Sequence, residues 1–464
     1  MTDLHYLTLS EVAARIKSGE LSSVEVTEAL LARIHHLDSE LHSYARVLDD
    51  QALATAERLD RERRQGKPLH PLHGVPVAIK DLLYTRGIPT ASGTLVMQDF
   101  VPDEDATVVS RLKQAGAVII GKTQLTEGAF GAHHPQIPAP VNPWNRSLWS
   151  GVSSSGSGVA VAAGLAYGAL GSDTGGSIRF PSAACGLVGI KPTYGRVSRH
   201  GAFPLAESLD HLGPMTRSVE DAARLLAVLA GPDPRDPTSL ADPVPNYPAM
   251  PAERVAGLTV GVDWGYVGTG VDEVVVATVR EALARLQDVG ASVREVSMPQ
   301  TTMTLVRGWS LTCAVECARA HRTYYPARKS EYGPVLAGLI EAGLAASDED
   351  YQALEQVRGQ FRQDLDRLLE DVDVIIAPCM PVLPPSLADM DAVAADDAER
   401  AEFITFTAPF DYSGHPTITL PAGRTSDRAP LSFQLIGRRL GEPTLIRVGA
   451  AYERVVGFHE HPLA

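Results

Sequence analysis

The segment GVSSSGSGVAVAAGLAYGALGSDTGGSIR, residues 151–179, is the part of this 464-residue chain around which the other motifs are arranged. It contains six serines, one threonine and eight glycines. Glycine inside a helix or strand costs about 0.5–1 kcal/mol relative to alanine, so packing alone would have favoured branched apolar residues. The excess of small and hydroxyl-bearing residues therefore indicates that this segment has a chemical role and not only a packing role.

Two parts of this segment have distinct predicted structures. Residues 156–167 predict a helix with small side chains on every face, which lets neighbouring elements approach closely. After it, the sequence DTGGS places two glycines directly before Ser177. Consecutive backbone N–H groups can then turn toward one point, which is the layout of an oxyanion hole beside a nucleophile. A nucleotide site over residues 171–177 is the weaker alternative, because no GK[ST] follows the glycines.

A nucleophilic serine needs a base, and no histidine lies in the neighbouring motif. A lysine can serve if burial lowers its pKa enough to leave the amine neutral. Lys80 follows the apolar run at residues 75–79, where a lysine is unusual unless it is paired or functional. The alternative is a salt bridge from Lys80 to Asp81 or to another acid.

Several functions are disfavoured by composition and motif. The net charge of −15 argues against nucleic acid or an anionic membrane as the main partner. The chain has no GxSxG, GxGxxG or HExxH motif, and the pairs His133/His134 and His459/His461 lack supporting cysteines, so we expect no metal and no organic cofactor. The four cysteines are expected to be small buried residues in a reducing compartment, and with no signal-like N-terminus the expected location is cytoplasmic.

Hydrophobic periodicity predicts an α/β fold, a mixed sheet covered by helices on both faces. Capping boxes at Thr8 and Ser22 predict N-terminal helices within about residues 7–65. Strand, helix and strand follow at residues 75–79, 105–114 and 117–120, which suggests a parallel crossover. The pattern recurs at residues 258–262, 274–289 and 293–296. The seven prolines of residues 231–255 predict an extended surface connector.

Three motifs together resemble the amidase signature family: GVPVAIKD at residues 74–81, GVSSSGS at 151–157 and GSDTGGSIRFP at 171–181. The segments CGLVGIKPTYG, 185–195, and GHPTITLP, 414–421, match the family as well. The similarity extends over essentially the whole chain. It implies one domain over residues 1–464, with a catalytic core at about 70–230, a connector at 231–256 and the rest of the sheet with a variable pocket region at 257–464.

The resemblance also implies a catalytic triad. Ser177 would be the nucleophile, Lys80 the deep base and Ser153, which in the family follows a cis peptide bond, the bridging serine. Ser154 and Ser155 are the alternatives for that bridge. The family usually has glycine at the position of Val152 and often at that of Ser155.

Other roles follow from the same resemblance. Backbone N–H groups of Thr174, Gly175, Gly176 and Ser177 would form the oxyanion hole, and Asp173 and Arg179 would hold the turn. Expected substrate contacts are Gly128, Ala129, Phe130, His133 and Trp149. Trp144 and Trp149 are as well explained by core packing as by a place in the pocket wall, and residues 309–343, which include Tyr324, Tyr325, Arg328 and Tyr332, are the expected leaving-group side.

The implied function is hydrolysis of carboxylic amides, extending to aryl amides, esters or carbamates (urethanes), with a small-molecule substrate and neither nucleic acid nor membrane as partner. Homodimers are common in the family. Two alternatives stay open: a glutamine-hydrolysing subunit of a tRNA-dependent amidotransferase, and a catalytically silent binding protein of the same fold.

Overall fold

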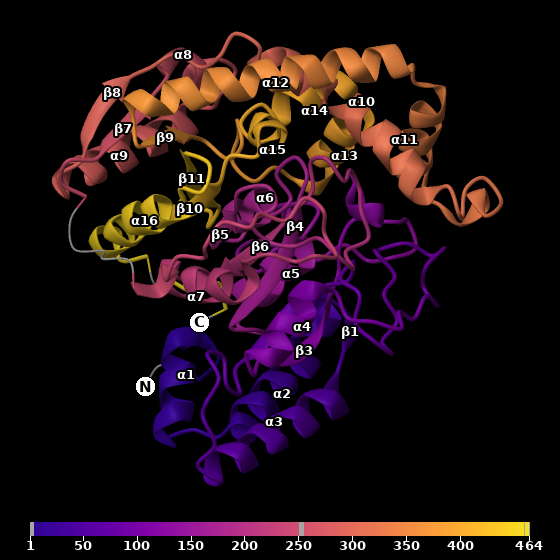
Figure 1. The fold of residues 1–464 in the computed structure, drawn as a ribbon, viewed down its shortest axis with the longest axis vertical. Helices are drawn as coiled ribbons and strands as arrows, with labels where there is room; N and C mark the ends of the chain where they lie inside the picture. Colours follow the sequence, from indigo (N-terminus) through magenta and orange to yellow (C-terminus); the bar gives the residue numbers. More distant parts are fainter. Residues whose placement is uncertain (1–3, 250–254, 459, 464) are drawn as a thin grey trace.

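One mixed sheet of eleven strands runs through the computed structural model, which describes residues 4–249, 255–458 and 460–463 (Figure 1). The strand order is β1-β3-β2-β4-β6-β5-β10-β11-β9-β7-β8. The strands are β1 (Tyr44–Val47), β2 (Pro76–Lys80), β3 (Val118–Thr123), β4 (Gly168–Asp173), β5 (Val188–Lys191), β6 (His211–Thr216), β7 (Thr259–Val262), β8 (Ser292–Glu295), β9 (Val374–Ala377), β10 (Thr417–Arg424) and β11 (Pro430–Gly437).

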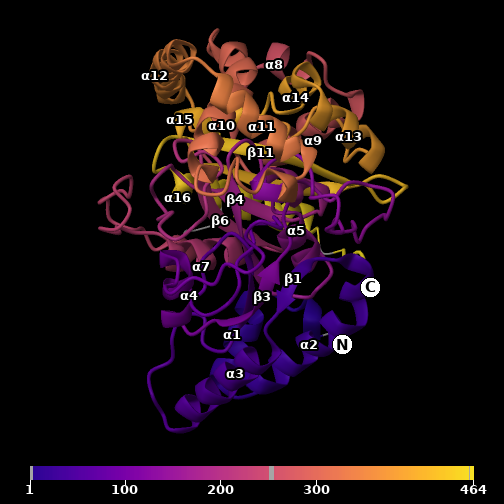
Figure 2. The same ribbon diagram turned by 90° about the vertical axis from the view of Figure 1, so that its right-hand side faces the viewer.

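Helices cover both faces of this sheet, as the sequence predicts. Helices α1 to α3 gather at one end of the molecule and α10 to α14 at the other (Figure 1, Figure 2). The α-helices are α1 (Leu9–Ser18), α2 (Ser23–Leu41), α3 (Asp49–Arg64), α4 (Thr107–Gln114), α5 (Ser155–Ala162), α6 (Arg179–Ala184), α7 (Val219–Leu229), α8 (Trp264–Gly268), α9 (Glu273–Asp288), α10 (Thr302–His321), α11 (Pro334–Ala345), α12 (Asp348–Asp371), α13 (Leu387–Ala395), α14 (Asp397–Phe403), α15 (Ala408–Ser413) and α16 (Glu442–Val456).

Local signals at the N-terminus are confirmed. Thr8 and Ser22 each accept a hydrogen bond from a backbone N–H three residues later, and Glu11 and Glu25 accept one in return, so both capping boxes form. The predicted crossover is also present, because β2 and β3 pair in parallel with α4 between them in the chain.

The sheet brings two chemical motifs to the same edge. Strands β2 and β4 are parallel neighbours, with Ile79 opposite Leu170. Lys80 is the last residue of β2, and Asp173, which begins the DTGGS turn, is the last of β4. Because parallel strands end at one edge, Lys80 and the turn before Ser177 must lie close together.

The small residues of α5 permit this approach. All eight residues of the helix are buried, and a Cβ added to Gly156 would lie 2.3 Å from the carbonyl oxygen of Ser43. The Ser153 loop therefore lies directly against the neighbouring loops, as the composition of residues 156–167 suggests.

The sequence patterns miss several elements, among them strands β1, β4 and β6 and helix α11. Strand β4 (GALGSD) carries no β-branched residue, and its glycines look like a turn. The proline-rich segment is not wholly a surface connector: Asp233, Asp236 and Tyr247 are buried, and Asp233 accepts hydrogen bonds from Thr107 and Ser198. Residues 250–254 of that segment lie outside the described part.

Within the described part of the chain, no helix is both long enough and apolar enough to span a bilayer.

Candidate functional site

Lys80 lies at the bottom of the site, fully buried and surrounded by hydroxyl groups. Its Nζ atom is 2.6 Å from Ser153 Oγ and 2.9 Å from both Ser154 Oγ and Ser172 Oγ. No carboxylate lies within ion-pair distance of Lys80 in the described residues. Burial lowers the pKa of Lys80 to about 7, although the charges of Asp173 and Asp210 oppose the shift.

The alternative salt bridge from Lys80 to Asp81 does not form. Asp81 pairs instead with Lys122, at 3.1 Å, and Lys122 also donates to the carbonyl of Leu83 and the hydroxyl of Thr90. The neighbouring acid is therefore occupied, which leaves Lys80 with neutral partners only.

Ser153 follows a cis peptide bond from Val152, at the position where the resemblance places it, although Val152 replaces the usual glycine. Ser154 also contacts Lys80, and its hydroxyl bridges to the backbone of Ser172. Ser155 points elsewhere and lies 3.2 Å from His133 Nε2. Of the three adjacent serines, Ser153 is therefore nearest to the lysine, and Ser155 is excluded from its contacts.

Ser177 lies within the glycine-containing turn that follows β4. Its carbonyl accepts the N–H of Ser154 at 3.3 Å, so the two serine loops are joined directly. The Ser177 hydroxyl has no hydrogen-bond partner among the described residues, and 9% of the residue remains exposed. The side chain is thus free to meet a ligand.

The turn before Ser177 is held by a buried carboxylate. Asp173 accepts the backbone N–H groups of Gly176, Ile178 and Arg179, at 2.7, 2.9 and 3.2 Å. The Arg179 side chain donates to both Asp173 oxygens and to Asp411, and all three side chains are fully buried. Burial disfavours the charge of Asp173, but Arg179 outweighs that effect and holds its pKa well below the usual value. The expected holding role of Asp173 and Arg179 is confirmed.

The hydrogen bond from the Gly176 N–H to Asp173 corrects the predicted oxyanion hole. The Gly176 N–H points at the Asp173 carboxylate, so it is not available to a substrate oxygen. The N–H groups of Thr174, Gly175 and Ser177 have no protein acceptor within the described residues. Gly176 is needed for shape instead, because its φ is +133° and a Cβ there would lie 2.4 Å from the Phe180 ring.

Trp309 of α10 packs on the other side of the turn. Its indole N–H donates to the carbonyl of Thr174 at 2.9 Å, and a Cβ on Gly175 would lie 2.6 Å from its ring. The turn is therefore enclosed by the rings of Phe180 and Trp309.

The predicted substrate contacts do not all lie in the same surroundings. Phe130 stacks on Trp309, with ring centroids 5.9 Å apart, and Trp149 packs edge-on against Phe403. Gly128 and Ala129 precede Phe130 with positive φ, and burial lowers the pKa of His133 to about 4. Trp144 donates to the carbonyl of Cys185 and packs on Phe458, which agrees with the core alternative.

In the predicted leaving-group side, residues 309–343, the predicted side chains mostly hydrogen-bond within that region and not to the Ser177 turn. Tyr325 pairs with Glu341, Tyr332 with His321, and Arg328 with Glu331 and the carbonyl of Val96. Of that region, Trp309 is the residue seen to touch the Ser177 turn.

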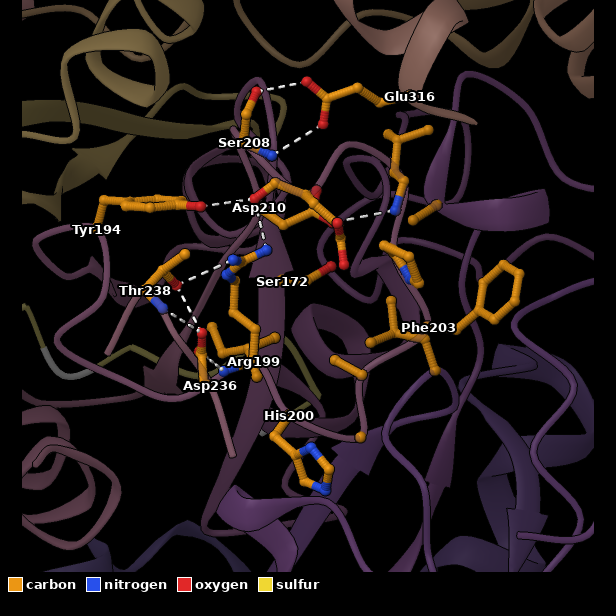
Figure 3. Close-up of a pocket in the computed structure, with 18 of the residues that line it drawn as sticks. Ser172, Tyr194, Arg199, His200, Phe203, Ser208, Asp210, Asp236, Thr238 and Glu316 are labelled. Carbon is orange, nitrogen blue, oxygen red and sulfur yellow. Dashed lines mark hydrogen bonds between the residues drawn. The ribbon is translucent and has the colours of Figure 1, made fainter. Parts of the chain in front are cut away.

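Two residues near the site are not predicted from the sequence. Ser172 completes the hydroxyl environment of Lys80, and Asp210 accepts the Thr174 hydroxyl at 2.6 Å. Both line one cavity (Figure 3). Ser172 belongs to β4, which the sequence patterns do not predict as a strand. Asp210 gives no local signal, because its contact depends on the pairing of β4 with β6.

No group of three or more His, Cys, Asp or Glu side chains is arranged to hold a metal ion in the described part of the chain. His459 lies outside that part. The four cysteines are buried and unbridged.

Comparison with known proteins agrees with this geometry. The Amidase family model matches residues 25–446, so the chain belongs to that family. The Mycobacterium tuberculosis protein named "Putative amidase AmiD" is 48% identical over 454 residues, covering 98% of this chain and 95% of the relative. A Roseiflexus sp. protein, which is a subunit of glutamyl-tRNA(Gln) amidotransferase, is 39% identical, covering 99% and 98%. The structure of 6-aminohexanoate cyclic dimer hydrolase complexed with substrate has a TM-score of 0.90, at 27% identity and 100% coverage of both chains.

Replacing Arg179 by methionine should strongly destabilise the protein, because Asp173 and Asp411 would stay buried without the cation that hydrogen-bonds to both of them. Breaking a buried ion pair by removing one partner costs about 3–5 kcal/mol. Arg224→Met is the control, since Arg224 forms an exposed i,i+4 pair with Glu220. Thermal unfolding should show a large fall in Tm for Arg179→Met alone; equal Tm values in the two variants would contradict the role of the network.

Proposed function

We propose that this member of the Amidase family hydrolyses carboxylic amides through an acyl-enzyme on Ser177, with Ser153 and Lys80 as the proton relay. The observation that carries the proposal is the environment of Lys80: a fully buried amine with a pKa lowered to about 7, no acidic partner within ion-pair distance among the described residues, and Ser153 Oγ at 2.6 Å. The two other fully buried lysines have different surroundings: Lys122 pairs with Asp81, and Lys191 donates to the carbonyl of His415 and lies 3.3 Å from His211 Nε2, so neither contacts a serine hydroxyl among the described residues.

Lys80, Ser153 and Ser177 would each have a separate role in the reaction. Neutral Lys80 accepts a proton from Ser153, which accepts the proton of Ser177 as that hydroxyl attacks the carbonyl carbon. The free N–H groups of the turn stabilise the oxyanion, and loss of one such donor costs about 3–4 kcal/mol in a comparable site. The relay returns the proton to the leaving amine, and water then hydrolyses the acyl group by the same route.

The surroundings of Ser177 favour an aromatic or apolar substrate. Two groups of rings lie against the turn: Trp309, which contacts it, stacks on Phe130 at 5.9 Å, and Phe180, which also contacts it, packs with Trp149 and Phe403 at centroid distances of 5.2–6.0 Å. We therefore propose aryl amides as preferred substrates, with aryl esters and carbamates sharing the same acylation step.

Glutamine hydrolysis is the second candidate, because the amidotransferase protein of Roseiflexus sp. matches over 99% of this chain. Such an activity would release ammonia from glutamine. A silent binding protein is a third, less supported candidate, since Lys80, Ser153 and Ser177 are all present and no described residue engages the Ser177 hydroxyl.

A substrate panel and covalent labelling distinguish these candidates. We expect turnover of 4-nitroacetanilide and phenyl carbamates, slow or no ammonia release from glutamine, and labelling of Ser177 by a fluorophosphonate that disappears in Ser177→Ala. Glutaminase activity without anilide turnover would support the amidotransferase alternative. Absence of both turnover and labelling would support the silent one.

The pH dependence of the hydrolysis rate should follow the protonation state of Lys80. Since the base must be neutral, kcat/KM for an uncharged anilide should rise with pH through about 7 and level off above it. Burial also raises the pKa of Glu127 to about 7, so Glu127→Gln is the control and should keep the same rising limb. Lys80→Met should abolish turnover; a normal rate in that variant would remove lysine from the mechanism.

Trp309→Phe should slow acylation of Ser177 about fivefold, because it keeps an aromatic ring against Gly175 but removes a hydrogen bond worth about 1 kcal/mol. Trp144→Phe is the matched control, since it removes the indole bond to Cys185 at a distance from the turn. Labelling rates measure both. Equal slowing in the two variants would show that the effect is general destabilisation.

A further inference from the structure

A polar cavity of about 520 Å³ lies on the Ser172 side of Lys80. Most of its described lining comes from residues 199–210 and 235–238 and the C-terminal half of α10, with further contributions from Leu82, Ala129, Tyr194, Leu212 and Tyr351, and it includes Ser172 but neither Ser153 nor Ser177 (Figure 3). The cavity therefore meets the hydroxyl environment of Lys80 without containing the proposed nucleophile, and of the expected substrate contacts its described lining includes Ala129 alone.

The buried carboxylates in its wall are already satisfied. Asp210 accepts from Thr174 Oγ1 and the N–H groups of Leu205 and Ala206. Asp236 accepts from the N–H of Arg199 and from both the N–H and the hydroxyl of Thr238. With both oxygens of each group bonded, these acids have little capacity left for a ligand.

Glu316 is satisfied in the same way, by the N–H and hydroxyl of Ser208 and by the Tyr351 hydroxyl. Glu207, which is exposed, is the lining carboxylate that accepts no hydrogen bond among the described residues. A ligand carrying several negative charges would therefore be disfavoured.

Apart from the Glu207 carboxylate, the unsatisfied side chains of the described lining include three donors, Arg319, Arg199 and Ser172. Arg319 is exposed, lies over the Tyr351 ring at 5.1 Å, and makes no hydrogen bond or ion pair within the described residues. The Arg199 side chain donates only to the carbonyl of Glu207 and the hydroxyl of Thr238, so its charge has no acidic partner within 4 Å in that part of the chain. The Ser172 hydroxyl accepts from Lys80, but its own hydrogen has no acceptor among the residues described.

We propose that this cavity is a second binding site, for a small molecule that carries one carboxylate. Arg319 anchors the carboxylate at the mouth with a charge-assisted hydrogen bond, and the charge of Arg199 adds to the attraction. The other end of the ligand reaches the Ser172 hydroxyl, which joins the site to Lys80. A volume of about 520 Å³ is within the range of small-molecule sites.

Benzoate is a suitable probe because it has one carboxylate and no amide bond, and benzyl alcohol is its uncharged counterpart. Calorimetric titration of the full chain should detect benzoate binding but much weaker binding of benzyl alcohol. Arg319→Ala should weaken benzoate at least tenfold. The control is Arg322→Ala, which removes an exposed arginine at the end of the same helix but outside the cavity lining, and should stay within twofold.

Two serine variants locate the bound molecule. Ser172→Ala should weaken benzoate at least threefold, whereas Ser177→Ala should leave its affinity unchanged. The proposal is overturned if benzoate does not bind, if Arg319→Ala and Arg322→Ala behave alike, or if Ser177→Ala rather than Ser172→Ala weakens binding, since the probe would then occupy the Ser177 site. Because benzoate binding needs no turnover, these outcomes are independent of whether the protein hydrolyses amides.

Discussion

The site depends on one buried carboxylate, Asp173. It accepts three backbone N–H groups of the turn that contains Ser177 and is itself held by Arg179. Burying an unpaired charge costs several kcal/mol, so the turn, Arg179 and Asp411 must be ordered together. This network links the end of β4 to α15, two segments more than 200 residues apart in the chain. The position of Ser177 is therefore fixed by the tertiary core.

The second constraint is the burial of Lys80 among neutral groups. A buried amine is costly when charged, and three serine hydroxyls can serve it in either protonation state, as acceptors for an ammonium or as a donor to a free amine. The adjacent pair of Lys122 and Asp81 shows the opposite solution to the same burial. Lys80 and Lys122, on neighbouring strands, thus differ in their surroundings because, among the described residues, only Lys122 lies within ion-pair distance of a carboxylate.

Local sequence patterns predicted many of the helices and strands. Capping boxes, apolar runs and helical spacing predicted the N-terminal helices, the β2–α4–β3 crossover and the later repeat of that pattern. The failures have a common cause: β4 and β6 lack β-branched periodicity, and they are strands because buried neighbours on both sides complete their hydrogen bonds. The buried half of the proline-rich segment has the same explanation, since Tyr247 and Asp233 find partners that are distant in sequence.

The sequence by itself determined which residue types could react: a lysine closing an apolar strand, three adjacent serines, and a serine preceded by two glycines. It also determined the family, through motifs that are each contiguous. Only the tertiary structure decided which acid pairs with which lysine, that Ser172 joins Ser153 and Ser154 at Lys80, and that the Gly176 N–H is taken by Asp173. These choices depend on distances between strands that are separate in the chain, and such distances are set by sheet pairing and burial.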